Sequence, residues 1–210
     1  MASVAPHTAD DPKQQLLERA LGYLTEHGIG DISLRELAAA LGTSHRMLIY
    51  HFGSKEGLFV AVVQEAENRQ RQLLANLFGG ETADFAASAR RFWQQMRSPE
   101  FAPLERLFFE LYGQALQGRS YALPVLAGFI DSWVQPLIPA LMAAGLSRSE
   151  AQAEARLGIA VGRGLLLDVL ATGDATGADE AYERYLAASA ALHREHAEAS
   201  GAPGTSAAPG

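Results

Sequence analysis

Residues 33–58 read SLRELAAALGTSHRMLIYHFGSKEGL, and this stretch decides the fold. Ser33 with Glu36 three positions later forms a capping box, which predicts the start of a short helix that Gly42 ends. A second short helix begins at Ser44, so only a tight turn separates the two helices. Two short helices joined by such a turn indicate a helix-turn-helix, a unit that reads DNA.

The spacing of residues inside this stretch supports that interpretation. Ala38 lies four residues before Gly42, and Leu48 lies six residues after it. The small side chain lets the two helices approach, the glycine tolerates a left-handed turn, and the leucine fills the gap between the helices. The residues expected in the core of this unit are Leu37, Ala38, Leu41, Leu48 and Phe52.

The rest of the chain is also predicted to be helical. A helix capped by Asp11 precedes the stretch and another capped by Ser54 follows it, and apolar residues recur three and four positions apart almost throughout. The fold class is therefore all-α, with an N-terminal three-helix helix-turn-helix domain and a larger C-terminal helical domain, about nine helices in all. Later helices are expected over 82–97, 100–117, 120–143, 147–172 and 178–197.

Composition and charge exclude several classes of protein. The sequence has no cysteine, which excludes disulfides and thiolate chemistry, and its net charge of -7 argues against a protein that coats nucleic acid indiscriminately. Residues 1–58 hold five basic and seven acidic side chains, so any basic surface has to be local. No acid falls between Leu37 and Lys55, where Arg46 and two histidines lie.

The stretch from Ser33 to Leu58 closely resembles the signature of the tetracycline-repressor (TetR) family of transcription regulators. Beyond Val63 the resemblance is one of length and helical pattern. The resemblance implies a homodimer whose two recognition helices enter successive major grooves of operator DNA, and repression of a nearby promoter that a small-molecule ligand relieves. The residues at the spacing of the family are Leu48, His51, Phe52, Lys55, Glu56 and Leu58.

The first turn of the second short helix holds the residues expected to read bases. Side chains there reach furthest into the major groove, so His45, Arg46 and Met47 are expected at base edges. Arg46 is the first candidate for a base contact, because its guanidinium can pair with O6 and N7 of guanine. The resemblance implies that Arg35 also reaches a base, and for both arginines a solvated surface position is the competing role. The residues expected at phosphates are Ser33, Thr43, Ser44, Tyr50, His51 and Lys55.

One position departs from the family pattern. The family usually has tyrosine directly after the leucine at position 48, whereas this sequence has Ile49 there and Tyr50 next. Two alternatives follow for the phosphate contact that the family tyrosine makes. Tyr50 takes over that contact, or it makes a different one.

The middle of the chain is rich in aromatic residues. If the resemblance holds, the helices there enclose an effector pocket, which is typically apolar with a few polar groups. Sparse charge in this region suggests a hydrophobic or aromatic, weakly charged effector. For each candidate residue, plain core packing is the competing role. The candidate lining residues are Phe108, Tyr112, Gln114, Tyr121 and Trp133.

The last two helices are expected to form the dimer interface, as a four-helix bundle with the same helices of a second copy. Glycines in the segment LGIAVGRGLLLDVL would let helices cross closely, and the leucines and valines would supply apolar contact. The expected interface residues are Leu157, Gly158, Val161, Gly162, Leu165 and Val169.

The expected organisation has four parts. Residues 1–10 form a disordered arm, 11–56 the helix-turn-helix domain, 57–198 the ligand-binding and dimerisation domain, and 199–210 a disordered low-complexity tail. The first residues lack the basic start and apolar run of a secretory signal, which favours a cytoplasmic protein. Prolines interrupt the apolar stretch 120–147, so a buried, kinked helix is expected there and not a transmembrane one.

Two alternatives remain beside a DNA-binding regulator. A helical protein of the same fold that binds ligands or partners but has lost operator binding would also fit the acidic N-terminal part and Ile49. An enzyme fits worse, because the sequence has no HExxH, P-loop, GxSxG or cysteine nucleophile. No cofactor or metal site is expected, since His193 and His196 share a helix face without further ligands.

Overall fold

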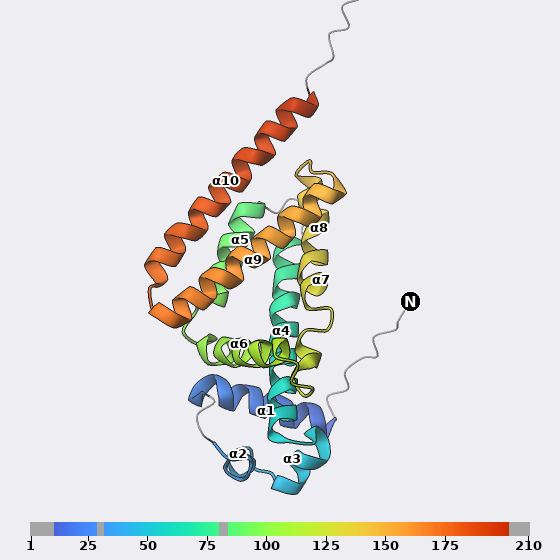
Figure 1. Cartoon of the computed structure of the whole chain (residues 1–210), viewed down its shortest axis with the longest axis vertical. Helices are drawn as coiled ribbons and strands as arrows, with labels where there is room; N and C mark the ends of the chain where they lie inside the picture. The colour runs from blue at the N-terminus through green and yellow to red at the C-terminus, as the bar shows by residue number, and fades with distance from the viewer. Residues whose placement is uncertain (1–10, 29–31, 80–83, 202–210) are drawn as a thin grey trace, which may run out of the picture. The chain divides into compact units, whose positions relative to one another are not determined.

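The structure, a computed structural model, describes residues 11–28, 32–79 and 84–201, with side chains up to Leu192. Over these ranges the chain is all-helical and has no strand, as expected (Figure 1). The elements are α1 Pro12–His27, α2 Leu34–Ala40, α3 His45–Phe52, α4 Lys55–Phe78, α5 Phe85–Met96, α6 Ala102–Leu116, η1 Leu123–Val125, α7 Phe129–Val134, η2 Gln135–Leu137, α8 Ile138–Ala143, α9 Arg148–Thr172 and α10 Ala175–Gly201.

Three expectations concern the ends of the chain. Those for residues 1–10 and 202–210, and for the side chains of His193 and His196, lie outside the described residues. Helix α10 continues to Gly201, which is inside the segment that the sequence predicts to be a disordered tail. Its start, Ala175, lies a few residues before the expected one.

The capping signals of the sequence form as predicted. At α2 the Ser33 amide donates to Glu36 Oε2 over 2.8 Å, and the Glu36 amide donates back to Ser33 Oγ over 3.3 Å. At α9 the Ser147 amide donates to Glu150 over 2.8 Å, and Ser147 Oγ accepts from the Glu150 amide over 3.4 Å. Each box satisfies backbone donors that a helix start leaves open, so both helices begin where the sequence predicts.

The apolar stretch after α6 differs from the expected single helix over 120–143. It is broken into η1, α7, η2 and α8, and Pro124, Pro136 and Pro139 lie in three of these pieces. Proline has no backbone N–H and clashes with the preceding turn, so the expected interruption by the prolines is present, whereas the single helical span over 120–143 was wrong. By length and composition alone, Leu123–Ala143 is the one stretch of the described chain that could cross a membrane.

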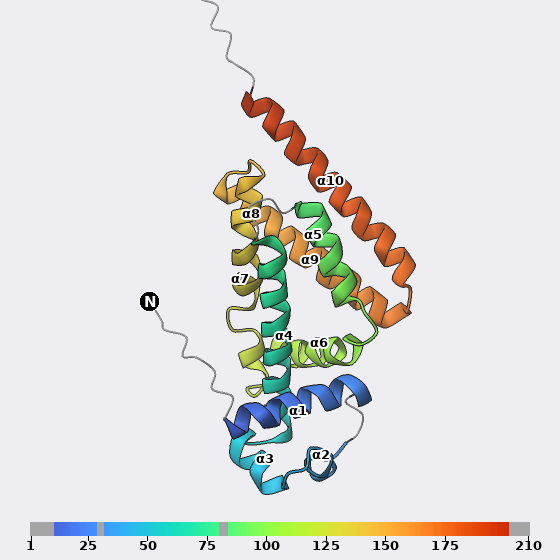
Figure 2. The same cartoon turned by 180° about the vertical axis from the view of Figure 1, so that it is seen from behind.

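The described chain divides into two compact units, one comprising the described residues up to 72 together with 96–129, and the other the described residues of 73–95 together with those from 130 onward. In the first unit α2 packs on α3, and α1 lies beside α6 (Figure 2). In the second unit α9 packs on α8 and α10 (Figure 1). The helix-turn-helix therefore belongs to the first unit, and the expected domain boundary at residue 56 stays a prediction.

Polar and aromatic contacts hold α5 against α10 in the second unit. Arg90 Nε and Nη2 donate to the two carboxylate oxygens of Glu183 over 2.7 to 3.0 Å, which raises the pKa of Arg90 and lowers that of Glu183. Trp93 Nε1 donates to Asp179 over 2.7 Å, and the Trp93 ring stacks on Tyr182 with centroids 4.9 Å apart. These contacts join side chains that are far apart in the sequence.

Candidate functional site

The turn between α2 and α3 has the geometry that the sequence predicts. Gly42 adopts a left-handed conformation, with φ of 64°, and the Thr43 amide donates to the Ala38 carbonyl over 2.9 Å. Leu48 is fully buried, as expected of the residue that fills the gap between the helices. The other core residues found buried as predicted are Leu37, Ala38 and Leu41.

Phe52 is an exception among the expected core residues. It is only half-buried, and it is the last residue of α3, directly before Gly53. The Lys13 ammonium lies 5.8 Å from the centroid of the Phe52 ring, so a cation from α1 covers part of its face.

The first turn of α3 presents its side chains to solvent. Ser44 caps the helix by accepting from the Met47 amide over 3.2 Å. His45 and Arg46 are exposed, and Met47 is 38% exposed. Leu48 anchors the opposite face of the same turn, so α3 is held rigidly while its first residues point outward. This arrangement suits contact with a groove of nucleic acid.

The residues expected at phosphates occupy several environments. Ser33 and Ser44 are exposed and act as helix caps, whereas Thr43 and Lys55 are half-buried. Hydrogen bonds with Ser33 lower the pKa of the Glu36 carboxyl, which fixes the start of α2. All of these residues, with the exposed Arg35, lie in the first unit.

Tyr50 and His51 differ sharply in exposure although they are adjacent. Tyr50 is 78% exposed, and Ile49 before it is 38% exposed. His51 is half-buried, and its Nε2 is a buried atom without a hydrogen-bond partner among the described residues. The two rings meet edge to face, with centroids 4.9 Å apart. Tyr50 is therefore free to reach outward from α3, and His51 is positioned by its neighbours.

Four of the five expected effector residues lie in the first unit. Phe108 and Tyr112 on α6 pack with Phe129, and their ring centroids lie 5.2 to 5.7 Å apart. Gln114 accepts a hydrogen bond from the Tyr121 hydroxyl, and Tyr121 is 39% exposed.

Trp133 belongs to the second unit, whereas the other four expected effector residues belong to the first. It is almost fully buried there. Its ring packs with Phe92, whose centroid is 5.9 Å away, and the Arg163 guanidinium carbon lies 4.9 Å from the ring centroid. These contacts account for Trp133 as a core residue of the second unit.

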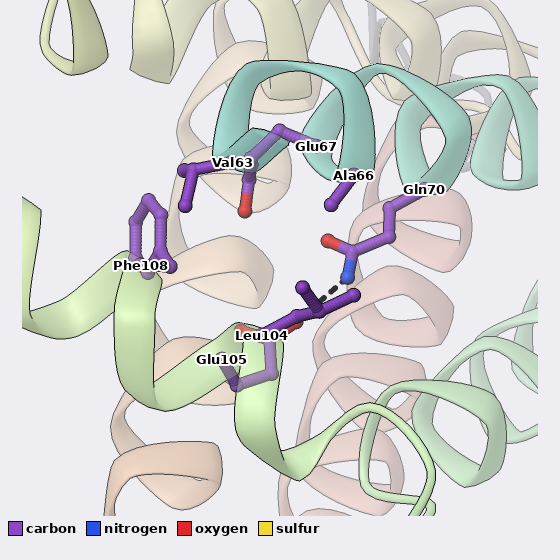
Figure 3. Close-up of a pocket in the computed structure, with 7 residues that line it drawn as sticks. All are labelled: Val63, Ala66, Glu67, Gln70, Leu104, Glu105 and Phe108. Carbon is purple, nitrogen blue, oxygen red and sulfur yellow. Dashed lines mark hydrogen bonds between the residues drawn. The ribbon is translucent and has the colours of Figure 1, made fainter. Parts of the chain in front are cut away.

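A small pocket lies in the first unit between α4 and α6 (Figure 3). It measures about 160 Å³ including the part open to solvent, and it is too narrow in this structure to admit a water molecule. Three polar side chains in its wall are 5% exposed or less, and Gln70 Nε2 donates to Glu105 Oε1 over 2.7 Å. The lining residues are Val63, Ala66, Glu67, Gln70, Leu104, Glu105 and Phe108.

Of the five residues that the sequence suggests for an effector site, Phe108 lines this pocket, whereas the polar residues of the pocket were not among those five. Glu67 and Gln70 lie three positions apart on one face of α4, a pattern that also fits a solvated helix face. One feature of the sequence could have indicated buried polar residues here. Glu105 is a lone acid on a face of α6 that is otherwise apolar and includes Leu104 and Phe108.

The expected dimer residues are divided between two faces of α9. Leu157 is 49% exposed, whereas the expected valines, Leu165 and Gly162 are half-buried. Gly158 faces α10 of its own chain, because a Cβ there would lie 2.8 Å from Tyr185 Oη. The exposed apolar residues at three- and four-residue spacing, here called the α9 stripe, are Ala153, Leu157, Ala160, Gly164, Leu167 and Ala171.

Comparison with known proteins supports the interpretation of the first unit as one that holds a helix-turn-helix. Residues 16–62 match the family model of bacterial regulatory proteins, tetR family. The transcriptional repressor AcnR of Corynebacterium glutamicum is 32% identical over 75 residues, 36% of this chain and 40% of AcnR. The transcriptional repressor NicS of Pseudomonas putida is 28% identical over 152 residues, 70% of this chain and 71% of NicS.

Solved structures share the fold as well. The multidrug-binding protein EbrR, in a complex with proflavin, superposes with a TM-score of 0.58 at 24% identity, over 83% of this chain and 99% of EbrR. The fold and the outward-facing start of α3 are those of a protein with an N-terminal helix-turn-helix. Over residues 16–62 the chain is therefore similar to bacterial regulatory proteins of the tetR family.

Proposed function

We propose that this chain is a cytoplasmic, ligand-responsive repressor that binds a palindromic operator as a homodimer. The observation that carries the proposal is the first turn of α3, where exposed His45, Arg46 and Met47 stand on a helix anchored by the fully buried Leu48. AcnR and NicS are themselves named as helix-turn-helix transcriptional repressors, which supports the direction of regulation.

The exposed residues of α3 divide by chemistry into two groups. Arg46 pairs with guanine, and the partly exposed Met47 and Ile49 suit contact with thymine methyl groups in the major groove. In the family, a tyrosine one position earlier usually contacts a phosphate, and here the strongly exposed Tyr50 makes that contact. Lys55 adds positive charge at the start of α4. Phosphate contacts position the protein, and Arg46 specifies the sequence.

A second copy of the chain covers the α9 stripe in this proposal. Leu157 and Leu167 are each 49% exposed, and the small residues between them let another helix approach closely. Charged residues are absent from the six positions of the stripe. An apolar stripe at this spacing is typical of helix-to-helix association.

The effector acts through α4 in this proposal. Helix α4 begins at Lys55, directly after the turn that ends α3, and its middle lines the pocket with Val63, Ala66 and Glu67. A ligand that enters the pocket has to separate side chains of α4 and α6, because the pocket is narrow. EbrR is named as a multidrug-binding protein, which supports ligand binding by this fold.

Selection of bound fragments from random DNA, followed by footprinting, tests the proposal. We expect protection of an approximately palindromic site by the wild-type protein. Arg46→Ala should weaken binding and relax specificity at one base pair by about 1 to 3 kcal/mol. Arg106→Ala is the matched control, since Arg106 is an exposed arginine on α6.

The outcome also separates the proposal from its main alternative. A protein of this fold that has lost operator binding would show only weak binding that ignores sequence and falls steeply with salt. Equal effects of the two arginine substitutions would contradict the role given to Arg46.

A further inference from the structure

We propose that the effector is an organic cation, such as a protonated amine or amidine on an apolar or aromatic body, and that Glu67, Gln70 and Glu105 hold its positive group. This inference rests on the proposed function and names the class of ligand. It starts from three polar side chains that converge on the pocket between α4 and α6 (Figure 3).

The burial of the two carboxyl groups is the first observation. Glu105 is 1% exposed and Glu67 is 5% exposed, and each lies beside apolar side chains of the pocket. Removing a carboxylate from water costs free energy unless hydrogen bonds and opposite charge compensate for it. Glu105 accepts from Gln70 over 2.7 Å, and the nearest Arg71 nitrogen is 3.8 Å from Glu67. A cationic ligand adds charge compensation at this position.

Gln70 supplies a second and independent observation. Its Nε2 donates to Glu105, and this bond turns Oε1 toward the pocket (Figure 3). Oε1 is a buried atom without a hydrogen-bond partner among the described residues. Buried carbonyl oxygens are almost always satisfied in native proteins, so the amide oxygen is available to a donor from outside the chain.

The chemistry of these groups defines the ligand. The carboxyl oxygens of the two glutamates and the Gln70 amide oxygen accept hydrogen bonds, so the group that they bind has to donate them. A positively charged N–H group meets both requirements, because it donates hydrogen bonds and compensates negative charge. The described residues contain no cluster of three acidic or histidine side chains for a metal ion, which favours an organic cation.

The apolar part of the wall fits the body of such a ligand. Phe108 lines the pocket and stacks on Phe129 with ring centroids 5.2 Å apart. An aromatic ring beside a buried acid binds organic cations through both its face and its apolar surface. This ligand differs from the weakly charged effector that the composition suggests, because the acids that bind it are brought together only by the fold.

Direct binding to the full-length protein tests the inference. Proflavin serves as the fluorescent cationic probe, and benzamidine and the neutral benzamide serve as competitors of similar shape. We expect benzamidine to displace proflavin and benzamide to fail. Glu105→Gln and Glu67→Gln should each weaken proflavin binding about tenfold or more, because each removes a charged hydrogen-bond acceptor.

Glu110→Gln is the matched control, because Glu110 is an exposed acid on the same helix as Glu105. Unchanged affinity in this control, with weaker binding in both pocket variants, supports the inference. Equal affinity in the wild type and both pocket variants overturns it, and so does displacement by benzamide as strong as that by benzamidine. Glutamine keeps the size of glutamate, and two separate variants guard against loss of folding in one.

Operator binding is measured separately, without proflavin, because proflavin also intercalates into DNA. We expect benzamidine to release the operator from the wild type and to release it less effectively from Glu105→Gln. Operator binding that benzamidine leaves unchanged, together with no proflavin binding, overturns the cation inference alone. Absence of operator binding overturns the proposed function, whereas the direct titration still decides whether the pocket holds a cation.

Discussion

Gly158 and Gly162 stand about one turn apart on α9 and have different surroundings. A Cβ at Gly158 would lie 2.8 Å from Tyr185 Oη, whereas a Cβ at Gly162 would meet no atom within 4 Å. The Tyr185 hydroxyl donates to Glu154 over 3.2 Å, and burial together with this carboxylate raises the pKa of Tyr185. Gly158 therefore permits the packing of α9 on α10 within one chain.

This difference predicts opposite effects of the same substitution. Gly162→Ala should raise the free energy of unfolding by up to about 1 kcal/mol, because alanine favours helix and no atom is displaced. Gly158→Ala should give a lower free energy of unfolding than Gly162→Ala, because the Tyr185 side chain has to move. Urea denaturation at one fixed protein concentration measures both. Equal stabilisation by the two substitutions would show that Tyr185 yields without cost.

At the scale of the elements, Tyr182 on α10 packs against α5. Its ring stacks on Trp93, and its hydroxyl lies 3.5 Å from the Ala89 carbonyl. Burial, with a smaller effect of the nearby Glu183 charge, raises the pKa of Tyr182 to about 12. The folded chain therefore keeps this phenol protonated at a pH where the unfolded chain ionises it.

Stability should fall in alkali for this reason. The contribution of Tyr182 is fully present below pH 10, near the pKa of an unfolded tyrosine, and it is lost as the pH rises toward 12. Over that window the wild type should lose about 3 kcal/mol more than Tyr182→Phe, which has no proton to release. Unfolding free energies of both proteins from pH 8 to 12 measure this. If the unfolding free energies of the two proteins changed with pH in parallel, the Tyr182 hydroxyl would be in contact with water and would not have a raised pKa.

At the scale of the whole molecule, the α9 stripe predicts the oligomeric state. Leu167→Glu and Leu157→Glu each place a charge among apolar residues and should convert the dimer to a monomer, which light scattering detects. Operator affinity should then fall about tenfold or more, because two linked half-sites no longer bind together. Leu116→Glu is the matched control, since Leu116 is 68% exposed on α6. A dimer that survives both stripe substitutions would refute this interface.

The features that the sequence determined depend on residues close together in the chain. The capping boxes at Ser33 and Ser147, the left-handed Gly42 and the buried Leu48 involve residues only a few positions apart, so their physics is readable from spacing alone. The same spacing places Arg46 on the outward face of α3. The all-helical class and the exposed first turn of α3 therefore follow from the chain itself.

Only the tertiary structure decided which distant residues meet. Gln70 and Glu105 lie 35 positions apart, and nothing in either segment reveals that their side chains share a buried hydrogen bond. Periodicity also could not choose between neighbouring faces of α9, since glycine and leucine occur on both, and packing against α10 left the stripe of Leu157 and Leu167 outward. Local backbone chemistry determines where helices begin and end, whereas burial depends on how the helices pack, and that is a property of the folded chain.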